Sequence, residues 1–215
     1  MPDLTCIYIT HNQERRTFER NIHQHLTVAC NATPIISVSQ RPIRLGHNIC
    51  MGMLGASNSN AWKQVLTGIK AATTKFVCIA ESDCLYPPDY FTFTPPHTQV
   101  IYYAAPVYIL FAMRGKAKYY ALKRKGTELA IVAGRDFLIE SITTMLQSSS
   151  EDTFVNTFRS LPKAEFTLSA PIVSIKTDRN MHRATPHATH NKLATIPHWG
   201  DAHDLLRILK DVTAQ

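Results

Sequence analysis

A short apolar run that leads directly into an acidic turn constrains the fold of this chain more than any other feature. Residues 76–80 are all apolar, as in a strand covered on both faces of its sheet. Glu81 and Asp83 follow at the end of that strand, and a Tyr-Pro-Pro sequence at 86–88 predicts a turn soon after them. Open α/β sheets bind their ligands at the carboxyl ends of strands, so these acids mark a candidate site.

The spacing of the two acids suits a divalent cation. Glu81 and Asp83 stand two positions apart, so both carboxylates reach one cation if the chain turns after the strand. Mg²⁺ held by only one or two carboxylates keeps coordination positions for substrate phosphates. We therefore predict Mg²⁺ or Mn²⁺ at Glu81 and Asp83; the alternative is a pair of solvated loop acids.

The first forty residues predict a βαβ unit. Residues 4–10 and 34–39 have the β-branched and aromatic composition of strands, and 13–26 has the apolar spacing of a helix that packs on a sheet. Two strands joined by a helix in this way are parallel and form a right-handed crossover. With 215 residues, the chain fits one α/β domain whose Rossmann-like mixed sheet is flanked by helices.

The rest of the chain continues the alternation of helices and strands. Further helices are expected at 61–73, with Asn60 as its cap, and at 137–147, 151–158 and 201–211; further strands are expected at 99–103, 106–113, 118–123, 127–133 and 171–176. Segments 106–113 and 118–123 are expected to pair as a hairpin. The stretch 40–60 is rich in Gly, Asn and Ser, and is either a plain loop or a segment that lets the backbone approach a ligand closely.

A net charge of +7 favours an anionic partner, and most of the excess lies in one segment. Between His97 and Thr127 there are six basic residues and no acid, namely Arg114, Lys116, Lys118, Lys123, Arg124 and Lys125. Aromatic residues alternate with them, as on a surface that contacts the phosphates and bases of a nucleic acid. A solvated hairpin with lysines along its edge would have the same composition.

The five cysteines are odd in number and show no C-x-x-C spacing, which favours reduced thiols over disulfides or a zinc site. No apolar run approaches the length of a membrane span, and the first residues lack the pattern of a signal peptide. We expect a protein of the cytoplasm, or of the host cytoplasm if it is viral. The oligomeric state is left open.

Two histidines are candidates to complete a metal site. His182 follows the predicted strand at 171–176, which is expected to lie beside the acidic turn. His198 is the competing candidate. The spacing of the remaining histidines matches no zinc module, so most are expected at the surface.

The order of these features resembles the GT-A fold of nucleotide-sugar-dependent glycosyltransferases. The resemblance rests on the βαβ unit that ends in Thr10-His11-Asn12, on the Gly/Asn/Ser-rich stretch before a helix, and on the acidic turn. The run Ile-Ala-Glu-Ser-Asp-Cys-Leu-Tyr-Pro at 79–87 is similar to the D-x-D region of family-2-like members, with Glu81 in place of the first Asp. The resemblance covers residues 4–95 well and the rest of the chain loosely.

The resemblance implies a donor half at 1–98, which binds a nucleotide sugar, and an acceptor half at 99–215. The implied donor is a UDP-sugar. The implied nucleotide contacts are Thr10, His11, Asn12, Asn60, Gln64 and Ser82; the implied metal ligands are Asp83, Glu81 and His182; the implied base belongs to the acidic pair Glu151 and Asp152. The cation would stabilise the leaving diphosphate, and the base would accept the proton of the acceptor hydroxyl.

The basic segment suggests which acceptor the enzyme uses. Compact, basic GT-A proteins resemble the glycosyltransferases, many of them viral, that act on hydroxymethylated pyrimidines in DNA, so DNA is the leading acceptor. A glycan, lipid or protein acceptor is the rival. A nucleotidyltransferase is less favoured because Thr-His-Asn stands where a Gly-rich phosphate loop would follow the first strand. A basic nucleic-acid-binding protein without enzymatic activity is the remaining alternative.

Overall fold

The computed structural model describes residues 3–113, 116–123, 130–147, 151–177, 179 and 192–210. The strands are β1 (Leu4–Thr10), β2 (Ile35–Ser39), β3 (His47–Cys50), β4 (Phe76–Glu81), β5 (Cys84–Leu85), β6 (Ile101–Met113), β7 (Lys116–Leu122), β8 (Ile131–Gly134), β9 (Lys163–Thr177), β10 (Lys192–Leu193), β11 (Thr195–Ile196) and β12 (Gly200–Asp201). The helices are α1 (Arg16–Cys30), α2 (Asn58–Ala71), the 3₁₀ helix η1 (Pro88–Phe91), α3 (Arg135–Leu146), α4 (Glu151–Ser160) and α5 (Ala202–Lys210).

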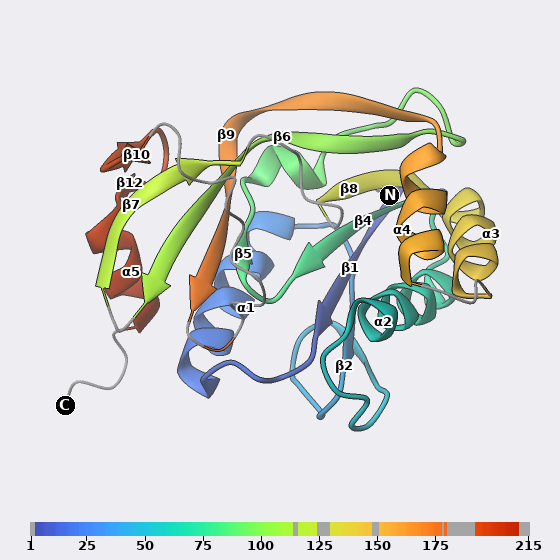
Figure 1. The fold of residues 1–215 in the computed structure, drawn as a ribbon, viewed down its shortest axis with the longest axis horizontal. Coiled ribbons are helices and arrows are strands. Elements are labelled where there is room, and N and C mark those ends of the chain that lie inside the picture. The colour runs from blue at the N-terminus through green and yellow to red at the C-terminus, as the bar shows by residue number, and fades with distance from the viewer. Residues whose placement is uncertain are drawn as a thin grey trace.

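One mixed sheet of ten strands runs through the described chain (Figure 1), and β11 and β12 form a separate antiparallel pair. Its strand order is β10-β7-β6-β8-β4-β1-β2-β3, and β9 pairs with both β5 and β6. β1 is parallel to β2 and to β4, whereas β8 is antiparallel to β4 and β6. The predicted mixed α/β sheet in a single domain is therefore confirmed, as is the hairpin of β6 and β7.

The alternation of side chains along the central strands separates two cores. Cys6 and Tyr8 of β1 face a core that includes residues of α1, η1 and α5. Ile7 and Ile9 face the other core, which includes residues of α2, α3 and α4. Figure 1 shows α2, α3 and α4 grouped apart from α1 and α5. β4 is buried on both faces, as its apolar sequence predicted, because helices cover both sides of the sheet.

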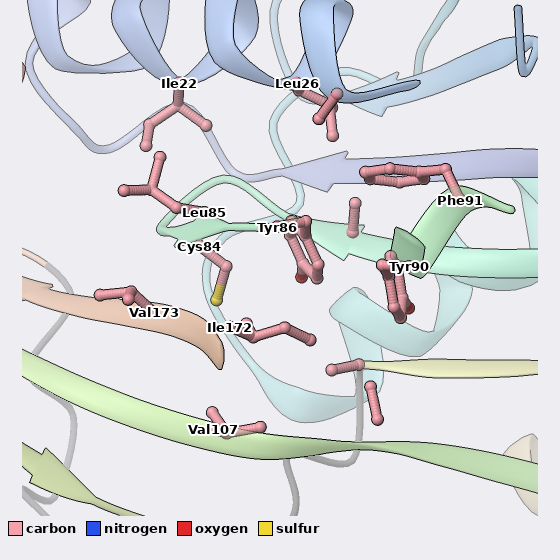
Figure 2. Packing of buried hydrophobic residues seen from close by; sticks show 14 of the residues in the cluster. Ile22, Leu26, Cys84, Leu85, Tyr86, Tyr90, Phe91, Val107, Ile172 and Val173 are labelled. Atoms are coloured by element: carbon pink, nitrogen blue, oxygen red, sulfur yellow. The ribbon is translucent and has the colours of Figure 1, made fainter. Parts of the chain in front are cut away.

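The chain after the acidic turn anchors that turn in the first core. Figure 2 shows Ile22 and Leu26 of α1 above Leu85 and Tyr86. The ring of Tyr86 lies 4.8 Å from that of Tyr90, measured between centroids. All of these side chains are buried, so the turn is held by packing on its carboxyl side.

Several predicted boundaries were wrong. The two strands predicted at 99–103 and 106–113 are one strand, β6, which begins at Ile101 and continues past Pro106 with a shift in register. β9 begins at Lys163, eight residues before the predicted start at 171, where exposed residues alternate with buried ones. The stretch 40–60 contains β3, a strand at the edge of the sheet whose residues are exposed or half-buried and so carry little apolar signal.

The helices also differ in detail from the sequence prediction. α2 begins at Asn58, and its cap is Ser57, whose side chain accepts a hydrogen bond from the backbone N–H of Asn60. On α3 the buried residues are Leu138, Ile142 and Met145, so only Ile142 is fully buried among the residues that the sequence offered for the core, which were Phe137, Ile139, Ile142 and Leu146. Phe137, Ile139 and Leu146 pack only partly against this core.

The cysteines are free thiols, as predicted. Cys6, Cys30, Cys78 and Cys84 are buried and Cys50 is exposed. Burial raises the pKa of the Cys6 and Cys84 thiols well above the ordinary value, so both stay protonated near neutral pH.

Tyr90 offers a test of how the sheet is held beside the turn. Its hydroxyl reaches the carbonyl oxygens of Ile79 at 2.7 Å and Ile131 at 3.0 Å, which belong to two adjacent strands. Tyr90→Phe should lower the free energy of unfolding by about 1–2 kcal/mol, because buried carbonyl groups lose a partner. Tyr120→Phe is the matched control, since the buried Tyr120 hydroxyl has no partner among the described residues. The control should be neutral or stabilising in urea unfolding, and equal losses in both variants would contradict this account.

Candidate active site

The carboxyl end of β1 is a topological switch point. From β1 the sheet continues to β2 on one side and to β4 on the other, and all three strands are parallel. Connections that leave in opposite directions open a crevice where such sheets bind ligands. Thr10 ends β1, Ser39 ends β2 and Glu81 ends β4, as expected for Glu81 from the sequence.

Asn12 ties the end of β1 to the end of β2. Its side-chain oxygen accepts hydrogen bonds from the backbone N–H groups of Gln40 at 3.0 Å and Arg41 at 2.9 Å. Its φ of 55° lies in the left-handed region, which Asn tolerates better than most residues. Thr10 supports the same bend, because its hydroxyl accepts from the N–H of Asn12 and donates to the carboxylate of Glu19. The predicted Thr10-His11-Asn12 exit is thus a fixed turn, with His11 half-buried in it.

Gln40 ties the same edge to the loop before α2. Its side-chain oxygen accepts from the N–H groups of Leu54 at 2.9 Å and Gly55 at 3.0 Å, and its amide nitrogen donates to the carbonyl of Gly55. Asn60 adds a bond from its amide to the carbonyl of Leu54 at 2.5 Å. The Gly/Asn/Ser-rich stretch is therefore held against the strand ends by side-chain amides.

Gln64 lies deeper than a ligand contact would require. Its amide nitrogen donates to the carbonyls of Thr10 at 2.8 Å and Val38 at 3.1 Å, and only 2% of the residue is exposed. It joins α2 to the two strands and so positions the loop residues. A direct contact of Gln64 with a nucleotide stays a prediction.

Hydrogen bonds of its backbone groups hold the acidic turn on both sides. The N–H of Glu81 donates to the hydroxyl of Tyr86, and the N–H of Ile175 donates to the carbonyl of Asp83 at 2.7 Å. Glu81 is half-buried, while Ser82 and Asp83 are buried. β5 pairs with β9 directly after the turn, which brings a strand from the far end of the chain to the acids.

That strand delivers a lysine to Asp83. The Lys176 ammonium lies 2.7 Å from Oδ2 of Asp83, and the Cys84 thiol donates to Oδ1 at 3.3 Å. Burial alone would raise the pKa of Asp83, but the charge and hydrogen bond of Lys176, with the charge of Lys123, lower it below the ordinary value. The charges of Asp83 and Glu81 outweigh burial at Lys176 and raise its pKa, so the pair is ionised near neutral pH.

A divalent cation finds only part of its ligand set among the described residues. Glu81, Asp83 and Cys84 place their ligand atoms within 4.8 Å of one another, so the predicted acidic group exists. Hard cations such as Mg²⁺ and Mn²⁺ prefer oxygen ligands, and the thiol of Cys84 is protonated and donates to Asp83. Because the Lys176 ammonium already neutralises Asp83 and Cys84 keeps its proton, this arrangement does not fit a divalent-cation site.

Sequence reasoning missed three polar residues at this edge, namely Gln40, Lys176 and Glu14. Glu14 is buried, and its carboxylate accepts from the hydroxyl of Thr177 at 2.7 Å. Burial and the charge of Asp83 raise the pKa of Glu14, while Thr177 and the charges of Arg179 and Lys176 lower it to a lesser extent. Gln40 and Lys176 both lie at strand ends, which is the signal that was overlooked.

The remaining predicted residues are placed only in part. Glu151 and Asp152 begin α4, which contacts α3, but their side chains lie outside the described part of the structure. His182, Arg114, Arg124 and Lys125 also lie outside the described residues, and Lys116 and Lys118 are described as backbone of β7 only. Lys123 is half-buried after β7. The exposed His198 packs on Trp199 and is not part of the acidic group of described residues.

No protein-family model matches the sequence, and no curated protein matches it. Among solved structures, the chain is similar to residues 1–349 of Staphylococcus aureus TarS, with 12% identity over 80% of this chain and 60% of that one and a TM-score of 0.48. It is similar to the bifunctional IspDF of Campylobacter jejuni, with 8% identity over 78% and 50% and a TM-score of 0.44. It is also similar to glucosyl-3-phosphoglycerate synthase of Mycobacterium tuberculosis, with 10% identity over 77% and 70% and a TM-score of 0.42.

These values assign the chain to none of the three families. The chain spans half to 70% of the length of the three structures. None of the helices in the described residues combines the length and the apolar character needed to cross a bilayer.

Proposed function

We propose that this chain is a GT-A-type glycosyltransferase that moves a sugar from a nucleoside diphosphate sugar, UDP-linked in the first instance, to a hydroxyl acceptor. One observation carries the proposal. The turn after β1, the amide-held loop before α2 and the acidic turn after β4 meet at the switch point of one sheet. Ligands of open α/β sheets bind at such a point, and the resemblance in sequence order supplies the class of ligand.

Each part of this edge has a role in the proposed transfer. The loops around Asn12 and Asn60 would border the base and ribose, and the acidic turn would lie at the sugar diphosphate. The acceptor oxygen attacks the anomeric carbon as the bond from that carbon to the diphosphate oxygen breaks. The hydroxyl proton goes to a carboxylate, for which Glu151 and Asp152 remain the proposed candidates.

The metal remains a separate prediction. The sequence predicted Mg²⁺ or Mn²⁺ at Glu81, Asp83 and His182; such a cation would supply charge to the leaving diphosphate only if Lys176 released Asp83. Because Asp83 is already paired with Lys176, no step of the proposed transfer depends on a metal. The division into a donor half at 1–98 and an acceptor half at 99–215 also stays a proposal. Lys176 belongs to the second half but pairs with Asp83 of the first.

Nucleotide binding tests the proposal without knowledge of the acceptor. Calorimetry with UDP, GDP and CMP should detect binding of at least one, with UDP expected to bind most tightly. Asn12→Ala should weaken that binding about tenfold, because the turn after β1 loses its bonds to Gln40 and Arg41. Asn31→Ala is the matched control, since Asn31 also has a positive φ, of 47°, but follows α1 before the opposite end of β2. Absence of binding by every nucleotide, with and without Mn²⁺, would overturn the proposed function.

DNA that carries a hydroxymethylated pyrimidine is the acceptor we propose. The support is electrostatic: the basic segment follows β6 and includes β7, and the charge of its half-buried Lys123 lowers the pKa of Asp83. Phosphate contacts of this kind position a duplex, while the base itself enters the site. Glycan, lipid and protein acceptors are the alternatives.

Replacing the basic residues together tests the proposed DNA acceptor independently of the proposed nucleotide-sugar donor. Changing Lys123, Arg124 and Lys125 to Ala should weaken DNA binding. The slope of log affinity against log salt concentration should fall in magnitude by about 3, or about one per lost phosphate contact. UDP affinity should stay unchanged. Filter binding over a series of salt concentrations measures the slope. An unchanged slope would remove the segment from the acceptor site, and salt-dependent DNA binding by a chain that binds no nucleotide would favour a non-enzymatic binding protein.

A further inference from the structure

We infer that Lys176 is the resident cation of the acidic turn and binds the donor diphosphate, so that nucleotide binding needs no divalent metal. This inference rests on the proposed function and deepens it by naming the group that meets the phosphates. It assigns Asp83 the role of holding Lys176 in place, instead of the role of a metal ligand.

The sheet itself fixes the lysine at this position. Cys84 pairs with Ser174 across β5 and β9, and the backbone bond from Ile175 to Asp83 closes the ladder one step further. Lys176 is the next residue, and its side chain returns to Asp83 at 2.7 Å. The contact therefore follows from the register of two paired strands, which holds it more firmly than a contact between surface loops.

The exposure of the two partners indicates which of them a ligand can reach more easily. The side chain of Asp83 is 12% exposed, whereas that of Lys176 is 29% exposed. An ammonium has three N–H donors, and the bond to Asp83 uses one of them. Lys176 can therefore donate toward the edge of the sheet while its charge stays paired on the protein side.

A purely structural role explains this pair less well. A buried ion pair adds little to stability compared with apolar side chains of similar size, because both charges lose water. A phosphate-binding role gives the charge a purpose, since a lysine is an effective point charge for phosphate oxygens.

The lysine supplies the charge that departure of the diphosphate requires. As the bond from the anomeric carbon to the phosphate oxygen breaks, negative charge develops on the leaving group. An ammonium already in place stabilises that charge without reorganisation. Asp83 and Glu81 raise the pKa of Lys176, so it remains protonated as an acidic nucleotide arrives.

Calorimetry with UDP, in EDTA and in Mn²⁺, tests this role in the full-length protein. We expect the two wild-type affinities to agree within a factor of about three, whereas Lys176→Met should weaken binding about tenfold to a hundredfold, as for the loss of a hydrogen bond between charged groups. Lys163→Met is the matched control. It removes the same charge at the exposed first residue of β9, the end opposite to Lys176, and should leave UDP affinity unchanged.

Asp83→Asn distinguishes between Lys176 and a metal ion as the cation that binds the phosphates. It removes the carboxylate but keeps Lys176, so UDP should still bind in EDTA. This arm holds even if Lys176→Met fails to fold, which a thermal melt would show. Binding that requires Mn²⁺ and disappears in Asp83→Asn would overturn the inference and restore the metal site, with the proposed function intact. UDP binding in EDTA that Lys176→Met leaves unchanged would also overturn it. No nucleotide binding by the wild type under any condition would overturn the proposed function and this inference together.

Discussion

Replacing Lys176 by Met is expected to lower the free energy of unfolding by about 3 kcal/mol, one of the two largest effects predicted for a single substitution in this chain. Asp83 is only 8% exposed, and Oδ2 loses the ammonium that lies 2.7 Å away. A buried carboxylate without a counter-charge costs the fold more than the intact pair contributes. Guanidinium unfolding of the two proteins at neutral pH measures the difference.

A double variant isolates the cause of that loss. Asp83→Asn combined with Lys176→Met removes both charges and should recover most of the stability that Lys176→Met loses. Lys163→Met should change the unfolding free energy by less than about 0.5 kcal/mol, as expected for an exposed surface residue. If the double variant is no more stable than Lys176→Met, the loss comes from packing of the lysine stem and not from the unpaired acid.

The pH dependence of the same pair has a definite sign. The folded-state pKa of Asp83 is depressed below the unfolded value of about 3.9, so its contribution is fully present above that pH and is lost as pH falls through the folded pKa. The stability difference between the wild type and Asp83→Asn should therefore be constant from neutral pH down to about 5 and shrink below about 4. A difference that instead grows as pH falls in that window would contradict the pairing.

Gly46→Ala is the second substitution with a large expected effect. Gly46 has a φ of 56°, and a Cβ there would collide with the backbone carbonyl oxygen of Ile35 on the adjacent β2. The left-handed conformation costs a side chain about 1–2 kcal/mol, and the collision with backbone atoms cannot be relieved by a change of rotamer. We expect a total loss of about 3 kcal/mol or more, measured as a shift of the urea midpoint with an unchanged slope.

Gly52→Ala separates the two contributions. Gly52 has a φ of 76° in the same loop region, but a Cβ there would have no atom within 4 Å. Only the conformational cost applies, so this variant should lose about 1 kcal/mol. Equal losses in the two variants would show that backbone strain alone governs this loop and that the approach of Gly46 to β2 does not matter.

Local sequence patterns determined the elements of this fold and the edge where its site lies. The β-branched run at 4–10, the apolar run at 76–80 and the helical spacing in 13–26 each depend on neighbours along the chain. Buried parallel strands carry continuous apolar runs, and a polar residue directly after one marks a strand end. For that reason Glu81 and Asp83 could be placed at the carboxyl edge of the sheet from the sequence alone.

Only the tertiary structure decided what those acids contact. Lys176 lies 93 residues from Asp83 along the chain, and it reaches the acid because β9 pairs with β5 in one register. A shift of one residue in that register would turn the side chain to the other face of the sheet. Register depends on packing across the whole sheet. The burial of Asp83 depends on the same packing, and because Asp83 is buried its charge needs a partner. The sequence therefore predicted an acidic strand end, and the pairing of distant strands supplied its cation.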